Sequence, residues 1–146
     1  MILRASIDID APIDRVFQIM LDFPQYSAWN PFVIGISGEA RQGAVIWLDV
    51  RFHDGQRHRV EEHIEVLDPP GERAELTYQT RGPLARFRLV RARRRQVLTR
   101  VDGSRTRYET DETFSGLLTA FLPRAGIQRG FDDCALALKQ RAERAG

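Results

Sequence analysis

The sequence predicts an α+β fold in which a curved antiparallel sheet of six to seven strands wraps around one long C-terminal helix. Three observations lead to this class. A helical apolar stripe lies near the start, strand-like alternation fills residues 33–116, and a second long helical stripe ends the chain. Such segregation of helices and strands is typical of α+β folds, and only the last helix is long enough to cover the sheet. With 146 residues, the chain is expected to form a single domain over residues 1–146.

The first strand and the first helix follow from two periodicities. Apolar and polar residues alternate from Leu3 to Ile9, which is the pattern of a half-buried strand. Pro12 then suits the first turn of a helix, and apolar residues recur at helical spacing from Ile13 to Leu21. Phe23-Pro24 ends this helix, and the segment up to Pro31 has room only for a short second helix.

Six further strands are expected within residues 33–116, where turn residues separate alternating segments. On the strands that carry Ile46 and Val60, the even-numbered side chains are mostly apolar and are expected to face inward. Opposed residues of a hairpin share a face, which requires a three-residue loop at 53–55 with Gly55 in the left-handed conformation. The expected strands cover about 33–38, 46–52, 58–66, 74–81, 86–101 and 105–114.

The final helix is predicted by apolar residues at offsets of four, three and four, namely Ile127, Phe131, Cys134 and Leu138. Pro123 does not fit inside a helix, so residues 117–122 are expected to form a separate or kinked turn before it. Cys134 is the only cysteine, which excludes an intrachain disulfide. Its place on the apolar stripe favours packing over nucleophilic chemistry.

Composition and charge argue against several classes of function. A net charge of +2 does not predict a polyanionic partner, and the arginine-rich run 91–95 is expected on a solvated strand face, so we expect no nucleic-acid partner. No apolar run approaches the ~20 residues of a membrane span, and residues 1–10 lack the core of a signal peptide, so we expect a cytoplasmic protein without integral membrane association. The three histidines do not share one face and no nucleotide-binding motif is present, so no metal and no cofactor are expected.

The element order, with APIDRVF opening the first helix, FPQYSAWNPF after it, RTRYETDETFSG ending the last strand and RGFDDCALALKQRAE in the final helix, resembles the SRPBCC or START-like (Bet v 1-like) superfamily. Within it, the sequence is most similar to the polyketide cyclase/dehydrase-like branch. The resemblance covers almost the whole chain. It implies a helix-grip fold with a deep, mostly apolar cavity between sheet and C-terminal helix, which different members use for lipids, polyketides, plant hormones or quinones.

The residues expected to line this cavity combine apolar walls with a few polar groups on even-numbered, inward positions. The predicted lining consists of Trp29, Phe32, Leu48, Val50, His58, Val60, Glu62, Tyr78, Thr80, Thr110, Glu112, Leu122 and Phe131. A portal to the cavity is expected from Trp29, Asn30, Phe32, Leu118, Phe121 and Leu122.

The inward carboxyl groups of Glu62 and Glu112 suffer desolvation, so each is expected to have a raised pKa or an arginine partner. A two-residue turn at Asp102-Gly103 would place Arg93 opposite Glu112, and a three-residue loop would place Arg94 there. Two interpretations of that pair stay open. We favour a structural salt bridge at the sheet rim, and the alternative is a pair that orients a ligand.

Three hypotheses of function follow from this arrangement. The one we favour is binding or transport of a hydrophobic small molecule, such as a lipid, a quinone or a polyketide-like compound, without catalysis. The alternative is a cyclase or dehydratase in which Glu62 with His58, or Glu112 with Tyr78, transfers protons. A third hypothesis, a module that binds a partner protein, predicts a small closed pocket and an exposed apolar patch.

Overall fold

The computed structural model describes residues 1–144, so the last two residues of the expected domain lie outside the described residues. Its body is one seven-stranded antiparallel sheet in the order β1-β7-β6-β5-β4-β3-β2. The strands are β1 (Ile2–Ile9), β2 (Val33–Ser37), β3 (Val45–Arg51), β4 (Arg57–Asp68), β5 (Arg73–Thr80), β6 (Arg91–Asp102) and β7 (Arg105–Ser115). The helices are α1 (Ile13–Leu21), η1 (Phe23–Gln25), α2 (Tyr26–Trp29), α3 (Pro83–Arg86), η2 (Thr119–Phe121) and α4 (Arg124–Arg144).

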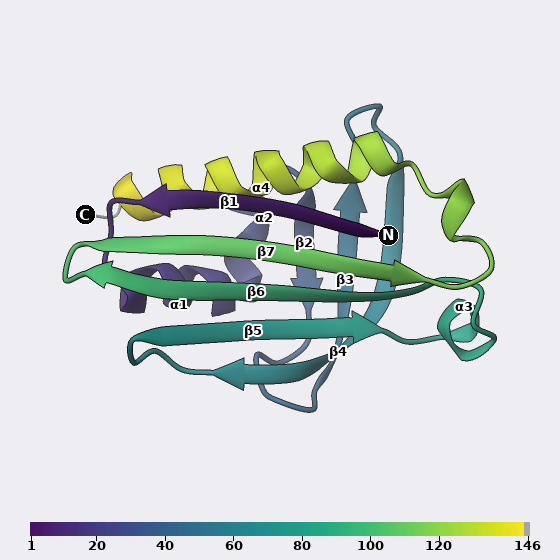
Figure 1. The fold of residues 1–146 in the computed structure, drawn as a ribbon, viewed down its shortest axis with the longest axis horizontal. Coiled ribbons are helices and arrows are strands. Elements are labelled where there is room, and N and C mark those ends of the chain that lie inside the picture. The colour runs from purple at the N-terminus through teal and green to yellow at the C-terminus, as the bar shows by residue number, and fades with distance from the viewer. Residues whose placement is uncertain (145–146) are drawn as a thin grey trace.

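The sheet curls, so that β2 and β3 run steeply across the direction of β1, β5, β6 and β7 (Figure 1). Helix α4 lies along this curved sheet, and α1 and α3 lie at opposite ends of the sheet (Figure 1). The predicted class, a curved antiparallel sheet that holds a long C-terminal helix, is therefore confirmed.

The two helical stripes read from the sequence are the faces that the helices bury. Helix α1 buries Ile13, Val16, Phe17 and Met20, and α4 buries the predicted Ile127, Phe131, Cys134 and Leu138. Each large apolar side chain removed from water stabilises the fold by about 1.5–3 kcal/mol. As expected, residues 117–122 stay outside α4, where η2 forms a single turn and Pro123 precedes the helix.

The hairpin between β3 and β4 has the predicted three-residue loop. Val50 opposes His58 and Arg51 opposes Arg57, and Gly55 adopts a φ of 89°. The even pairing sum keeps inward residues opposite inward residues, and a left-handed backbone at this position is least strained for glycine. The prediction for this turn is confirmed.

The hairpin between β6 and β7 selects one of the two registers that the sequence left open. Asp102 opposes Arg105, but a bulge between Arg100 and Asp102 shifts the pairing, so that Arg94 lies opposite Glu112. A bulge inserts one unpaired residue and restores the register that a longer loop would give. The turn is therefore short, yet Arg94 and not Arg93 is the inward arginine.

Two expected strand details are wrong. Residues 86–90 do not extend β6, because Gly82 has a φ of 96° and Pro83 opens the short helix α3 there. On β4, a bulge between Ile64 and Val66 reverses the alternation, so Leu67 rather than Val66 packs against the core. Alternation alone cannot reveal a bulge, since the bulge changes which side chains face inward without changing the residue types.

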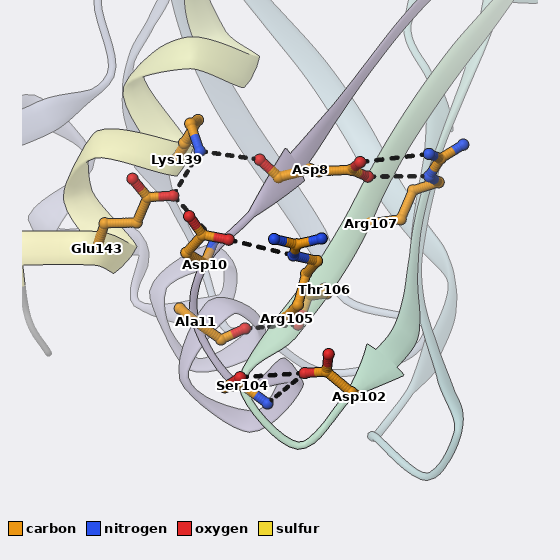
Figure 2. A network of polar contacts seen from close by, with 10 residues as sticks. All are labelled: Asp8, Asp10, Ala11, Asp102, Ser104, Arg105, Thr106, Arg107, Lys139 and Glu143. Carbon is orange, nitrogen blue, oxygen red and sulfur yellow. Dashed lines mark hydrogen bonds and ion pairs between the residues drawn. The ribbon is translucent and has the colours of Figure 1, made fainter.

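The end of the molecule near the β6–β7 turn is tied together by a network of surface charges (Figure 2). Asp8 pairs with Arg107 at 3.0 Å, and Asp10 pairs with Arg105 at 3.2 Å. Lys139 and Glu143 of α4 pair with each other and hydrogen-bond the backbone of β1 and the residue that follows it. This surface network, made of Asp8, Asp10, Arg105, Arg107, Lys139 and Glu143, fastens α4 to the β1 edge of the sheet.

Candidate functional site

A buried polar centre lies on the inner face of the sheet, beneath α4. It consists of Glu62, Tyr78, Arg94, Tyr108, Thr110 and Glu112, all of which are buried. Strand register brings them together, because Arg94 of β6 lies opposite both Tyr78 of β5 and Glu112 of β7. A charged guanidinium and two carboxyl groups thus share one interior surface, where charge is costly unless it is compensated.

Arg94 is the cation of this centre, and its side chain is held from several sides. Its Nε donates to the Thr110 hydroxyl at 3.1 Å, and its terminal nitrogens donate to the Tyr78 and Tyr108 hydroxyls at 3.4 Å each. The guanidinium lies over the Phe131 ring, 4.5 Å from its centroid. Burial acts to lower the pKa of Arg94, but its polar neighbours outweigh burial and raise the pKa, so this residue stays charged.

The two carboxyl groups are less well compensated than the cation. Oε2 of Glu62 is buried and has no hydrogen-bond partner among the described residues. Burial raises the pKa of Glu62 well above its usual value, and the neighbouring Glu112 raises it further. Burial also raises the pKa of Glu112, to about 7, although Arg94 opposes the shift. Burial therefore favours the protonated form of Glu62, and Glu112 gains or loses its proton near neutral pH.

Arg93 and Arg94 lie on opposite faces of the sheet, and neither forms an ion pair with Glu112. Within residues 1–144, no ion pair of 4.0 Å or less joins Arg94 to Glu112 or to Glu62, so the salt bridge that we favoured at the sheet rim is not formed. Arg93 points to the outer face instead, where its Nε contacts Glu65 at 2.8 Å. Alternation along β6 explains the split, because neighbouring residues of a strand face opposite sides.

A groove of about 320 Å³ opens between the β3–β4 hairpin and the first half of α4. Phe32 and Phe52 line it together with Gly126 and Gly130. The Phe32 ring packs against Phe131 with centroids 5.9 Å apart, and Phe131 in turn lies under Arg94. A Cβ at position 130 would approach the Phe32 ring to 2.3 Å, so glycine is required for this close packing. Phe32 and Phe131 therefore separate the groove from the buried polar centre.

The other polar residues predicted for the site lie apart from this centre. His58 faces inward but is exposed at the hairpin end, where it meets the Phe52 ring edge-on with centroids 5.4 Å apart. Thr80 is half-buried and hydrogen-bonds the backbone of Ala92. The structure thus brings Glu62, Glu112, Tyr78 and Thr110 together, but it does not bring His58 to Glu62.

The apolar residues predicted for the cavity have mixed positions. Leu48 and Phe131 belong to the buried core, while Trp29, Val50, Val60 and Leu122 are half-buried. Of the expected portal, Leu118 and Phe121 are exposed. Asn30 is buried and structural instead, since its side-chain oxygen accepts the backbone N–H groups of Phe32 and Val33. Asn30 thereby fixes the backbone from which the Phe32 ring projects.

Tyr108 and Gln96 also belong to the buried polar surroundings, although neither was predicted from the sequence. The Tyr108 hydroxyl donates to Oε1 of Gln96 at 2.8 Å, and both side chains are buried on the inner face. Both have even numbers on strands whose even positions carry Arg94 and Thr110, so the parity of the strands was the signal that could have found them.

A larger groove, of about 780 Å³, lies on the outer face of the sheet beside α3. Four arginines line it, namely Arg81, Arg86, Arg91 and Arg93. Two of them are engaged by carboxylates, since Arg81 lies 3.3 Å from Glu61 and Arg93 lies 2.8 Å from Glu65. This groove was not predicted, because alternation along single strands does not show where α3 stands above the outer face of the sheet.

The described residues contain neither a membrane-spanning helix nor a metal-binding cluster. Within residues 1–144, no helix is long and apolar enough to cross a membrane. The same residues hold no group of three or more histidine, cysteine or acidic side chains placed to bind a metal ion.

The curled sheet, the gripped helix and the polar groups on the inner face define a protein of the Bet v 1-like, START-like class. Residues 2–143 match the model of the family described as polyketide cyclase/dehydrase and lipid transport, and the chain belongs to this family. No curated protein sequence matches the chain. Membership supports a ligand-binding or cyclase role.

Solved structures show the same fold at low sequence identity. The Zhui aromatase/cyclase from a Streptomyces species superposes with a TM-score of 0.81 at 18% identity, covering 99% of this chain and 94% of that one. A truncated norcoclaurine synthase from Thalictrum flavum gives 0.73 at 8% identity, covering 97% and 92%. Ara h 8.0201 gives 0.69 at 14% identity, covering 99% and 98%. At such identities the likeness concerns the fold alone.

Proposed function

We propose that the protein binds a hydrophobic small molecule between the sheet and α4, with a hydroxyl or carbonyl group of the ligand placed at the buried polar centre. The observation that carries this proposal is the unpartnered Oε2 of Glu62. An unsatisfied buried polar atom costs roughly 1–3 kcal/mol, which a ligand that supplies the missing hydrogen bond would recover. Family membership supports the same class of ligand, whether lipid or polyketide-like.

The groove beside α4 is the proposed way in. Its floor is aromatic, and Phe32 stands between it and Phe131. Rotation of the Phe32 ring toward the solvent, together with a shift of the Phe131 ring beneath it, would connect the groove with Arg94 and Glu62. An apolar ligand body would then replace the aromatic contacts of Phe32, while its polar group meets the buried centre.

The test is binding of three probes, a long-chain fatty acid, a quinone and a polyhydroxylated aromatic polyketide, measured by native mass spectrometry and calorimetry. We expect at least one probe to bind, and Glu62→Gln to weaken it about tenfold, as the loss of one buried hydrogen bond from the carboxyl group predicts. Glu61→Gln, one residue away on the outer face, is the matched control and should bind as the wild type does. Equal affinity in both variants, or no binding of any probe, would contradict the proposal.

A second candidate function, catalysis of a dehydration, is favoured by one observation. Two carboxyl groups with raised pKa values share the centre, and that of Glu112 is about 7. In a β-hydroxy ketone, the Glu112 carboxylate would remove the proton next to the carbonyl while protonated Glu62 delivers its proton to the leaving hydroxyl. A carbon–carbon double bond and one water molecule form, and exchange with solvent returns the proton from Glu112 to Glu62.

Catalysis is distinguished from binding by turnover of a β-hydroxy ketone probe. If the protein is a dehydratase, Glu62→Gln and Glu112→Gln lower the rate about 100-fold or more while each variant still binds the product. The wild-type rate should rise with pH through about 7, where Glu112 loses its proton. Binding of the probe without any turnover would leave the carrier role and exclude this second one.

A further inference from the structure

Two loops meet at the end of the molecule opposite the surface network. One covers residues 81–90 and contains α3, and the other covers residues 116–123 and contains η2 (Figure 1). Backbone hydrogen bonds join them, from Leu117 N–H to the Arg88 carbonyl at 3.1 Å and from Leu118 N–H to the Leu89 carbonyl at 2.8 Å. We call these segments the paired loops.

The paired loops expose large apolar side chains to an unusual degree. Phe121 is 82% exposed, Leu117 is 79% exposed and Phe87 is 67% exposed. Leu84 and Leu118 are also exposed. Single exposed apolar residues are ordinary on a protein surface, but five of them on two hydrogen-bonded loops mark a contact surface.

The charged residues within the paired loops themselves are all basic. No acidic residue occurs between Arg81 and Val101, and none occurs from Thr113 to Phe131. Besides Arg81, which pairs with Glu61, the exposed arginines at this end are Arg86, Arg88, Arg91 and Arg124. Within residues 1–144, none of the four has a carboxylate within 4.0 Å. Their positive charge is therefore uncompensated, although the whole chain carries only +2.

We propose that the paired loops dock on the surface of a membrane that contains anionic lipids. The exposed apolar side chains would enter the boundary between head groups and acyl chains, while the arginines bind lipid phosphates. Apolar side chains ringed by unpaired cations are the combination that favours such peripheral binding. Guanidinium groups add bidentate hydrogen bonds to phosphate oxygens.

The outer groove gives the lipid phosphates a defined place. Because Arg81 and Arg93 already contact Glu61 and Glu65, the donors left for an external anion in this groove are Arg86 and Arg91. Both lie beside Phe87, whose side chain also lines the groove. The arrangement requires no ligand in the interior, so it stands or falls independently of the proposed small-molecule binding.

The test is flotation of the purified protein with two kinds of vesicle. One contains phosphatidylcholine alone, and the other contains phosphatidylcholine with about 30% phosphatidylserine to represent an anionic leaflet. We expect binding to the anionic vesicles only, decreasing as salt is raised. Each arginine near an anionic surface contributes to the free energy of binding. The double variant Arg86→Gln/Arg88→Gln should therefore bind about 30-fold more weakly. Phe121→Ser should weaken binding about tenfold through lost insertion.

Matched controls lie at the opposite end. Arg105→Gln/Arg107→Gln removes the same charge from the surface network, and Val101→Ser removes an exposed apolar side chain. Both should float as the wild type does. Equal loss of binding in control and test variants, or no flotation with anionic vesicles, would overturn the proposal, and the second result would point instead to an acidic protein partner.

A spectroscopic arm tests insertion directly, and a competition arm separates lipid from free anion. Phe121→Trp should gain a blue-shifted emission with anionic vesicles that the wild type, with Trp29 and Trp47, lacks. Inorganic phosphate at about 10 mM, which competes for single phosphate contacts, should leave flotation largely intact. If phosphate alone binds at Arg86 and Arg91 and abolishes flotation, the groove serves a soluble anion and the membrane proposal is wrong.

Discussion

The buried polar centre and the surface network use the same residue types to opposite effect. In the surface network each carboxylate has a basic partner or a backbone donor, and the hydrogen bond from Lys139 lowers the pKa of Glu143 (Figure 2). In the buried centre, one guanidinium serves two carboxyl groups and contacts neither as an ion pair, while burial raises the pKa of Glu62 and of Glu112.

The cost of a charge depends on its exposure and on its partners. Exposed pairs gain little, because water and salt screen them. Buried and incompletely compensated charges cost stability, and proteins retain them mainly where they act on a ligand or a substrate. The contrast therefore supports our proposal of a ligand site at the buried polar centre, while the surface network fastens α4 to β1.

The largest change in stability is expected when the buried cation, Arg94, is removed. Arg94→Met should lower the free energy of unfolding by about 3–5 kcal/mol, because it removes the positive charge beside Glu112 and the buried hydrogen bonds that the guanidinium donates. Urea unfolding at pH 7 measures the change. Arg93→Met is the matched control on the outer face and should cost less than about 1 kcal/mol. Similar costs for the two variants would show that Arg94 is no more buried or engaged than its neighbour.

The next largest effect is expected in the pH dependence of stability, which separates buried from exposed carboxyl groups. The pKa of Glu112 is about 7 in the folded protein and 4.5 ordinarily, so the native state holds more protons between these values. Stability should therefore fall by about 3 kcal/mol as pH rises from 4.5 to 7, through this group alone. Glu112→Gln should flatten that part of the unfolding free energy against pH. An unchanged slope would mean that Glu112 titrates as an ordinary carboxyl group.

The seal between groove and centre predicts a smaller effect. Gly130→Ala places a Cβ against the Phe32 ring and should cost about 1–2 kcal/mol, the overpacking penalty less the gain in helix propensity. Gly126→Ala meets Phe52 only at 3.4 Å and is the control, expected to be neutral or slightly stabilising. Thermal unfolding measures both. If Gly130→Ala is tolerated as well as Gly126→Ala, Phe32 does not form a tight seal.

The smallest effect belongs to the surface network. Glu143→Gln should change the unfolding free energy by less than about 0.5 kcal/mol at low salt and by nothing measurable at high salt. Because the pKa of Glu143 is lowered, its contribution is present at neutral pH and disappears as pH falls through that pKa, opposite in sign to Glu112. A salt-independent loss of more than 1 kcal/mol, on the scale of buried pairs, would contradict the distinction.

The class of fold can be predicted from the sequence alone, because periodicity indicates directly which side chains avoid water. The stripes of α1 and α4, the loop at Gly55 and the inward parity that selected Glu62, Tyr78, Thr110 and Glu112 were all readable along the chain. Each depends on residues that are close in sequence.

The positions of the interior charges depend on bulges and on the register between strands, which only the folded structure shows. The bulge beside Asp102 chose Arg94 as the inward arginine, and strand order placed it between Tyr78 and Glu112. The curl of the sheet left His58 at the exposed hairpin end, and the union of two distant loops created an apolar, arginine-rich surface. Local patterns fix which face of a strand or helix is buried, but the position of an interior charge relative to other strands depends on pairing between residues far apart in the chain.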